Sequence, residues 1–270
     1  MQYDPVKRSL GNVFNKASWL RKLFYHLLDL LLLRAWYIKR EVKRLFGKSR
    51  NASVQILDAG SGYGQYDFFM SSYLAKAQIL GVDVKQEQID DCNQFFSKIG
   101  RGDRVSFQYA DLTEFQNPDS YDLVLSVDVM EHILEDEKVF QNIYSSLHKG
   151  GTLLISTPSD QGGSDVHDEH DHSFIDEHVR DGYNIDDIRH KLEKAGFSQV
   201  EAKYSYGTPG SIAWTLTMKW PITMVNVSKL FFVLLIPYYI VVYPFAFLLN
   251  WIDTITSHST GTGLIVKAVK

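Results

Sequence analysis

Short apolar runs alternate with helical stretches from residue 53 to residue 206, and this alternation constrains the fold more than any other feature of the sequence. The runs that we expect to form strands are 54–59, 78–82, 104–110, 121–127, 151–157 and 199–206. Helical patterns fill the gaps at 65–76, 86–99, 135–148 and 184–195. Helices of this length between strands predict right-handed parallel crossovers, so the sequence indicates an α/β protein with a doubly wound sheet.

The composition is typical of a folded protein with one generous core. The chain has 270 residues, of which 45% are hydrophobic and 22% are charged. Its single cysteine, Cys92, cannot form an internal disulfide, which excludes a disulfide-stapled scaffold. The N-terminus carries Asp4 and lacks an early apolar stretch of the kind found in secretory signals, so we expect a cytoplasmic protein.

The first 50 residues are basic, whereas the rest of the chain is acidic. Residues 1–50 hold 12 Lys and Arg against 3 acidic residues, a net charge of +9, and the remaining residues carry −13. From residue 19 to residue 46 apolar positions recur at steps of three, four and seven, which indicates a helix. This basic arm either packs on the domain or lies in a membrane interface, with its basic side chains at anionic headgroups.

A run of 23 residues without a charge extends from Leu230 to Ile252 and is long enough for a membrane-spanning helix. Pro237 and Pro244 oppose a regular helix. A strand-like tail follows at 263–269; if it completes the sheet, both ends of the run lie on one side of a membrane, and 23 residues are too few for two spans. Three interpretations remain: a shallow, proline-bent insertion in the interface, a contact between two copies, or part of the body's own core.

A glycine-rich turn, Asp58-Ala59-Gly60-Ser61-Gly62-Tyr63-Gly64, directly follows the first expected strand and precedes a helix. Glycines let the backbone turn tightly and approach a ligand, and the N-terminus of the helix offers free N–H groups. The glycines are spaced two apart, unlike the GxGxxG fingerprint of dinucleotide-binding folds. The turn therefore predicts a cofactor site of a different kind.

This acidic-x-Gly-x-Gly-x-Gly pattern resembles the first motif of the class I S-adenosylmethionine (SAM) dependent methyltransferases. Similar motifs follow in order: Gly81-Val82-Asp83, Tyr109-Ala110-Asp111-Leu112, the fourth-strand stretch 121–132, and the Lys-Gly-Gly turn with the fifth strand at 147–158. The resemblance covers 51–206 and the terminal strand. It implies a Rossmann-like sheet of seven strands, mostly parallel with the last strand antiparallel. Glu131-His132 and Ser156-Thr157-Pro158 resemble the ubiquinone-type O-methyltransferase branch.

The resemblance implies SAM as the cofactor and indicates the residues that bind it. The three glycines would let backbone amides reach the methionyl part, Asp83 would accept hydrogen bonds from the ribose hydroxyls, and Asp111 would lie near the adenine amino group. The cofactor-binding residues that we expect are Asp58, Gly60, Ser61, Gly62, Gly64, Asp83, Val84, Asp111, Leu112, Ser126 and Val127. The alternative for Asp83 and Asp111 is strand-end capping or simple solvent exposure.

Methyl transfer from a sulfonium is an in-line displacement, so the enzyme aligns the acceptor and, for a hydroxyl, removes its proton. His132, just past the fourth strand, is the candidate base because histidine titrates near neutrality. Alternatively, the pair is structural, with Glu131 capping a helix and His132 shaping the pocket wall. The His- and acid-rich segment 165–172, with 176–178 nearby, is interpreted as a mobile lid over the acceptor pocket rather than a metal site.

The sequence thus divides into a basic amphipathic helical arm (1–50), a SAM-binding core (51–207), an apolar insertion that faces membrane or substrate (208–257), and the final strand (258–270). The aromatic and apolar insertion predicts a hydrophobic acceptor. We therefore expect a SAM-dependent methyltransferase, peripherally bound to an anionic membrane surface, that methylates a lipid- or quinone-like acceptor at a hydroxyl.

Two alternatives to this function remain. One is a non-catalytic, membrane-recruited SAM-binding module, which the intact glycine motif and Asp83 disfavour. The other is a nucleic-acid methyltransferase that uses the basic arm. The leucine-rich face of the arm and the lack of an aromatic platform for bases disfavour it, so no nucleic-acid partner is expected.

Overall fold

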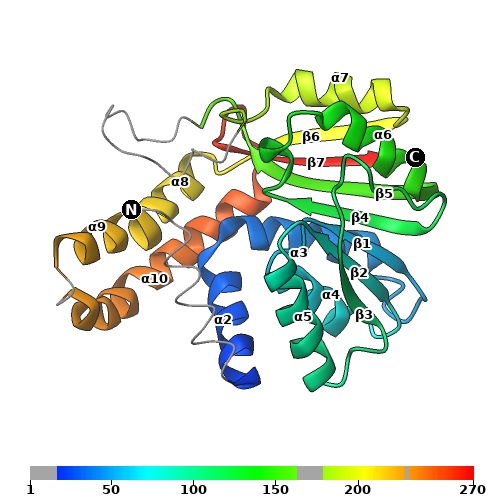
Figure 1. Ribbon diagram of the computed structural model, residues 1–270. Helices are drawn as coiled ribbons and strands as arrows, with labels where there is room; N and C mark the ends of the chain where they lie inside the picture. The colour runs from blue at the N-terminus through cyan, green and yellow to red at the C-terminus, as the bar shows by residue number, and fades with distance from the viewer. Residues whose placement is uncertain (1–16, 163–178, 229–230) are drawn as a thin grey trace.

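Seven strands form one sheet in the computed structural model, which describes residues 17–162, 179–228 and 231–270 (Figure 1). The sheet order is β3-β2-β1-β4-β5-β7-β6. The strands are β1 Gln55–Ala59, β2 Gln78–Asp83, β3 Val105–Tyr109, β4 Tyr121–Val127, β5 Leu147–Pro158, β6 Gln199–Ser205 and β7 Gly263–Val269. Neighbours from β3 to β5 are parallel, whereas β7 is antiparallel to both β5 and β6. The predicted doubly wound sheet with an antiparallel last strand is confirmed.

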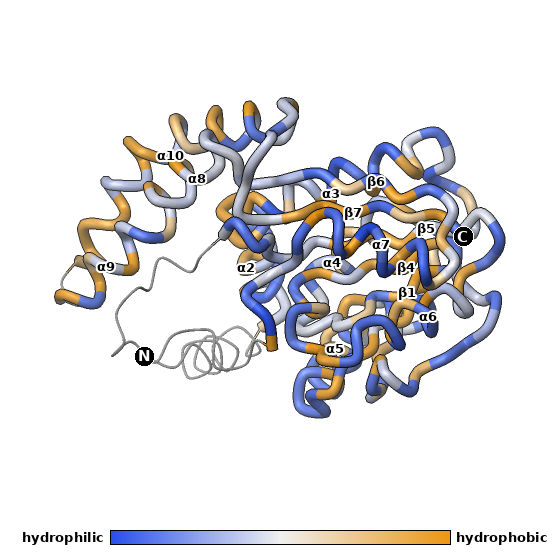
Figure 2. The backbone as a smooth tube through the Cα atoms, turned by 90° about the horizontal axis from the view of Figure 1, so that it is seen from above, coloured by the Kyte–Doolittle hydropathy of each residue, from blue (hydrophilic) through white to orange (hydrophobic). Residues whose placement is uncertain are grey.

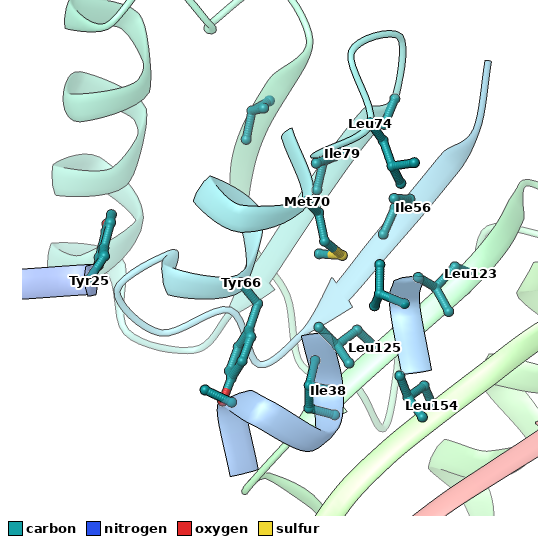
Figure 3. Packing of buried hydrophobic residues seen from close by; sticks show 14 of the residues in the cluster. Tyr25, Ile38, Ile56, Tyr66, Met70, Leu74, Ile79, Leu123, Leu125 and Leu154 are labelled. Carbon is teal, nitrogen blue, oxygen red and sulfur yellow. The ribbon is translucent and has the colours of Figure 1, made fainter. Parts of the chain in front are cut away.

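Helices cover both faces of the sheet. The helices on one face are α2 Ser18–Leu31, α3 Leu33–Phe46, α4 Gln65–Tyr73 and α5 Gln86–Lys98, and those on the other are α6 Asp136–Ser146 and α7 Ile185–Ala195. Successive side chains of β1 enter different cores: Ile56 packs with the first group and Leu57 with the second. Figure 3 shows the first core, where Ile38 of α3 lies near Leu125 and Leu154. Burial on both faces explains the nearly continuous apolar runs of the strands.

The basic arm contains two helices, so the expectation of one continuous helix from 19 to 46 was wrong at Leu32. The backbone there is extended, with φ −93° and ψ 109°. The break lets α2 bury Tyr25 beside α4 and α5 while α3 buries Ile38 and Val42 against the sheet. The described part of the arm therefore packs on the domain, although α2 keeps an outward apolar stripe of Trp19, Leu23, Leu27 and Leu30.

The insertion between β6 and β7 is a helical hairpin that projects from the body (Figures 1 and 2). Its first arm runs through α8 Thr208–Trp214, a π-helical turn Thr215–Lys219 and α9 Trp220–Val227; its second arm is α10 Phe231–Ile255. The Tyr238 hydroxyl donates to the Leu216 carbonyl at 2.7 Å, and that of Tyr239 donates to the Thr217 carbonyl at 2.6 Å. We call this pair of arms the hairpin.

Within the described ranges, α10 is the one helix whose length and composition would suffice to cross a bilayer, with a mean hydropathy of 2.2 over its most apolar window. The helix continues through Pro237 and Pro244. Only 6% of that window is buried. The interpretation of the run as part of the body's core is therefore wrong, because the helix leaves the sheet edge and keeps most of its surface exposed.

Candidate cofactor and acceptor site

The glycine-rich turn joins β1 to α4 at the carboxyl edge of the sheet, beside the switch point between β1 and β4. Gly60, Gly62 and Gly64 have φ values of 90°, 51° and 74°. These values lie in the left-handed region that favours glycine. A Cβ atom at Gly60 would lie 2.2 Å from Val129, whereas one at Gly62 would meet nothing closer than a side-chain oxygen of Gln88 at 3.9 Å. Gly62 therefore leaves open space above the turn.

Asp83 ends β2 and faces the glycine-rich turn. Its Oδ2 accepts a hydrogen bond from the Gly62 N–H at 2.9 Å, and its Oδ1 accepts one from the Lys85 N–H at 2.9 Å. Each carboxylate oxygen keeps a second acceptor position. The predicted ribose contact is thus brought directly beside the turn, and the carboxylate also fixes the backbone conformation of that turn.

The polar groups beneath the turn are buried. Asp58, Ser61 and Ser126 are at most 7% exposed, and Asp58 Oδ2, Ser61 Oγ and Ser126 Oγ have no hydrogen-bond partner among the described residues. Burial also raises the pKa of Asp67 in α4 to about 7, and burial together with the Asp67 charge raises that of Asp58 well above its usual range. The two carboxyls together therefore keep at least one proton near neutral pH.

The remaining predicted cofactor residues lie at the ends of neighbouring strands. Asp111 follows β3, is exposed, and accepts hydrogen bonds from the backbone N–H and the hydroxyl of Thr113, both at 2.8 Å, which lower its pKa. Val84 is exposed beside Asp83, Leu112 is buried, and Val127 ends β4. The strand-end capping expected as an alternative for Asp111 is observed, with its carboxylate still open to solvent.

The N-terminal helix α2 lies against the turn from outside the sheet, which the sequence patterns did not predict. The buried Arg21 guanidinium donates to the Tyr63 carbonyl at 3.0 Å and to the Asp91 carbonyl at 3.2 Å. The Tyr25 hydroxyl donates to the same Tyr63 carbonyl, and Arg21 donates to the Tyr25 hydroxyl at 2.7 Å. The sequence did offer one signal for this packing: Arg21 and Tyr25 are four residues apart and therefore share one face of the helix.

A second polar group lies past the end of β4. Asp128 has φ 52° and forms an ion pair with Arg34 of α3. The Arg34 backbone N–H donates to the Tyr206 hydroxyl at 3.0 Å, and burial raises the pKa of Tyr206 to about 12. Helix α3 of the basic arm and Tyr206, at the start of the insertion, therefore meet at the mouth of the site.

Glu131 and His132 occupy a 3₁₀ turn, Met130–His132, that follows Asp128. The Glu131 side chain is 1% exposed, its Oε2 accepts a hydrogen bond from the Thr157 hydroxyl at 3.0 Å, and burial raises its pKa to about 8. The side chain of His132 is exposed. The two members of this pair thus have different environments, and Glu131 is a titratable group that the sequence patterns did not single out as a base. The predicted lid at 165–172 and 176–178 lies outside the described residues.

These features fit SAM. A nucleoside needs an acidic acceptor at the end of β2, which Asp83 provides; a methionyl group needs close access to backbone N–H groups, which the open space at Gly62 allows. The buried hydroxyls of Ser61 and Ser126, which have no hydrogen-bond partner among the described residues, lie at the same edge.

The comparisons with known proteins agree with this geometry. A family profile described as a methyltransferase domain matches residues 50–202, more than half of the chain. The chain belongs to this methyltransferase family. The class I family and fold predicted from the sequence are confirmed, and SAM is the cofactor of that family; the lean toward the ubiquinone-type branch stays a prediction.

Individual relatives are more distant. Phosphoethanolamine N-methyltransferase 1 of Triticum aestivum is 30% identical over 163 residues, a match that covers 56% of this chain and 30% of the wheat protein. A probable S-adenosylmethionine-dependent methyltransferase of Mycolicibacterium smegmatis is 28% identical over 163 residues, covering 60% of this chain and 59% of that protein. The chain thus spans less than a third of the length of the wheat relative.

Among solved structures, phosphoethanolamine N-methyltransferase 2 of Haemonchus contortus in complex with SAM has a TM-score of 0.61. The sequence identity is 22%, and the match covers 87% of this chain and 52% of that one. At this identity the likeness shows the shared fold alone.

Proposed function

We propose that this protein transfers a methyl group from SAM to an acceptor that lies beside the end of β4. The observation that carries the proposal is the open left-handed turn at Gly62, held by the Asp83 carboxylate at the switch point of the sheet. Asp83 would hold the ribose, the turn the methionyl part, and Asp111 the region of the adenine. When bound there, SAM supplies an electrophilic methyl group. The protein aligns the acceptor and removes its proton.

Two titratable groups past β4 are the candidates for accepting a proton from the acceptor. His132 is exposed and is the base predicted from the sequence. Glu131 is buried on Thr157 and keeps its proton to about pH 8, so it accepts a proton only above that pH. Arg34 and Asp128 border the same mouth and orient what enters it.

We propose a hydrophobic, lipid- or quinone-like acceptor that is methylated at a hydroxyl. The support is a groove of about 480 Å³ that begins at Tyr206, next to Arg34, and runs along the first arm of the hairpin to Trp220. The residues that line it carry no charge; Ile212, Leu216 and Trp220 are apolar, and threonine and serine hydroxyls accompany them. A groove along an exposed apolar hairpin, which begins at a residue hydrogen-bonded to Arg34, supports an acceptor that partitions into lipid.

A second candidate acceptor is a small amino alcohol phosphate. Its support is the substrate in the names of the wheat and Haemonchus proteins, which are phosphoethanolamine N-methyltransferases. For this acceptor the nitrogen would receive the methyl group, and the hairpin would only locate the enzyme. Under either candidate we propose that the protein is peripheral to a membrane on its cytoplasmic side.

One experiment separates these possibilities. Purified protein is incubated with SAM carrying a labelled methyl group, together with either a total lipid extract or phosphoethanolamine, and the label is partitioned between organic and aqueous phases. The proposal predicts protein-dependent label in the organic phase with the lipid extract. Label only in the aqueous phase with phosphoethanolamine selects the second candidate. SAM binding without transfer to either would support a non-catalytic module.

A further inference from the structure

The second arm of the hairpin is apolar around most of its circumference. Val233, Ile236 and Ile240 of α10 are 72, 69 and 70% exposed. Exposed apolar side chains also occupy the adjoining faces, at Phe232, Leu234, Val241, Phe245 and Leu248. The side facing the first arm is marked by Tyr238 and Tyr239, whose hydroxyls reach that arm. A surface of this extent in water is costly, so it requires a covering partner.

The first arm differs, because it carries a polar stripe. Lys219, Thr223 and Asn226 are exposed and follow one another at steps of four and three, which places them on one face of the helical arm. Ile222 and Val227 are exposed on its flanks. The hairpin as a whole therefore has one arm that is apolar on all its exposed faces and one arm that is amphipathic.

The hairpin satisfies its irregular backbone internally. A π-helical turn at Thr215–Lys219 alters the regular hydrogen bonding of the first arm. Tyr238 and Tyr239 of α10 donate their hydroxyls to the Leu216 and Thr217 carbonyls in this turn. Backbone groups that are satisfied within the segment are what a lipid environment requires.

The base of the hairpin is fixed to the body by buried polar contacts. Asp253, which is 0% exposed, accepts hydrogen bonds from the Tyr37 hydroxyl at 2.6 Å and from the Gly210 N–H at 2.8 Å. These contacts join α10 to both α3 and α8. The flanking strands pair with each other, with Ser205 opposite Gly263, so the hairpin leaves and returns at the same edge of the sheet.

We infer that the hairpin is a monotopic membrane anchor that lies along the bilayer surface, with α10 in the acyl region and the polar stripe of the first arm at the headgroups. Both ends of the hairpin lie on one side, which excludes a single span. Insertion of both arms across the bilayer would place Lys219, midway along the first arm, in the hydrocarbon. A second copy of the chain would cover one face of α10 and leave the other apolar faces in water.

This inference specifies how the proposed membrane association occurs, and it does not depend on methyl transfer. The chain suits a direct probe, since its single cysteine, Cys92, is buried and should therefore not react with a thiol-reactive fluorophore. Three full-length variants are labelled with an environment-sensitive dye: Ile240→Cys on α10, Asn226→Cys on the polar stripe, and Asp103→Cys at the opposite edge of the sheet. Each is mixed with vesicles of phosphatidylcholine and phosphatidylglycerol that carry a nitroxide either on the headgroup or deep in the acyl chain.

The anchor predicts that the label at residue 240 is quenched most by the acyl-chain nitroxide, that the label at 226 is quenched most by the headgroup nitroxide, and that the label at 103 is unaffected. Equal or deeper acyl quenching at 226 would overturn the in-plane arrangement. If the label at residue 240 is not quenched by either nitroxide, and the protein self-associates in solution in a way that shields this label, then the partner of α10 is a second copy and not the bilayer.

A matched pair of substitutions checks the same inference without labels. Ile240→Lys should abolish flotation with these vesicles, whereas Thr223→Lys, also at an exposed site of the hairpin, should preserve it. SAM affinity, measured by calorimetry on both variants, should stay unchanged. Flotation that survives Ile240→Lys would contradict the anchor. Absence of SAM binding by the wild-type chain would contradict the proposed function instead.

Discussion

Arg34 of α3 forms an ion pair with Asp128, the residue that follows β4, and so connects the N-terminal helices to the mouth of the site. The side chains are each 32% exposed, and an ion pair this accessible adds little to stability. Its position, between the cofactor edge and the groove that begins at Tyr206, indicates a role in orienting the acceptor.

The first prediction follows from this pair. Asp128→Asn should lower methyl transfer by at least about tenfold, because Arg34 loses the charge that holds it, while the melting temperature and SAM affinity stay nearly unchanged. Steady-state turnover, thermal unfolding and calorimetry check the three quantities. A matched control is Asp186→Asn, which removes an exposed ion pair with Arg189 on α7 and should leave turnover unaltered. A fall in melting temperature alone would assign Asp128 a structural role.

The second prediction concerns the contact at the end of β2. Asp83→Ala should weaken SAM binding by about 1–3 kcal/mol through lost charge-assisted hydrogen bonds. It should also lower the melting temperature, because the Gly62 and Lys85 N–H groups lose their acceptor. Asp111→Ala removes an exposed carboxylate from the adenine end and should weaken binding less. Equal SAM affinity in Asp83→Ala and the wild-type protein would refute the ribose assignment.

The third prediction separates Glu131 from His132 by the pH dependence of turnover. If Glu131 accepts the proton, turnover rises with pH until about 8, where its carboxyl ionises, and Glu131→Gln removes that rise. If His132 is the base, His132→Ala should lose at least about 100-fold in turnover with unchanged SAM affinity, and Glu131→Gln should leave the pH profile as it is in the wild type. A profile that neither substitution alters would place the base elsewhere.

The fourth prediction concerns the buried carboxyl pair beneath the glycine-rich turn. The pKa of Asp67 rises from 3.8 to about 7 on folding, so between these values the unfolded chain releases a proton that the folded protein keeps. The free energy of unfolding therefore decreases by about 1.4 kcal/mol per pH unit as the pH rises through this window, and this loss ends above about 7. Asp67→Asn should remove this contribution, while the contribution of Asp58, whose pKa burial also raises, remains.

Denaturant unfolding of both proteins at about pH 5 and about pH 7 measures the difference, which should be roughly 2–3 kcal/mol larger for the wild-type protein. Asp111→Asn serves as the control, since the pKa of Asp111 is lowered rather than raised. Identical pH dependence in wild type and Asp67→Asn would show that Asp67 takes up no proton on folding.

Much of the core was predictable because its strands are buried on both faces and separated by clear helical patterns. The strand Tyr121–Val127 has the bounds expected from its apolar run, and the last strand is antiparallel, as the family resemblance implied. The break at Leu32 was not predictable from periodicity, because α2 and α3 carry the same spacing of apolar residues on both sides of it. The bend accompanies a long-range contact, the hydrogen bond from the Tyr25 hydroxyl to the Tyr63 carbonyl in the glycine-rich turn.

The site was predicted in part for similar reasons. Glycines and acidic residues at strand ends can be recognised from their immediate neighbours in the sequence. The buried environment of Glu131, by contrast, includes Thr157 of β5, which is distant in the sequence. The pairing of 208–227 with α10 was missed because the first arm is divided among short helices and a π-helical turn, which leaves no regular pattern.

Calorimetric titration of SAM into the purified chain and into Gly62→Leu tests the cofactor site. The wild-type protein should bind SAM at micromolar concentrations and Gly62→Leu should not bind it, because the added side chain fills the open space above the turn. Gly150→Leu is the matched control: its φ of 82° imposes a similar strain, its surroundings are also open, and it lies away from the site, so its SAM affinity should equal that of the wild type. Equal SAM affinity in Gly62→Leu and Gly150→Leu would contradict the site, and absence of binding by the wild-type chain would contradict the proposed methyl transfer.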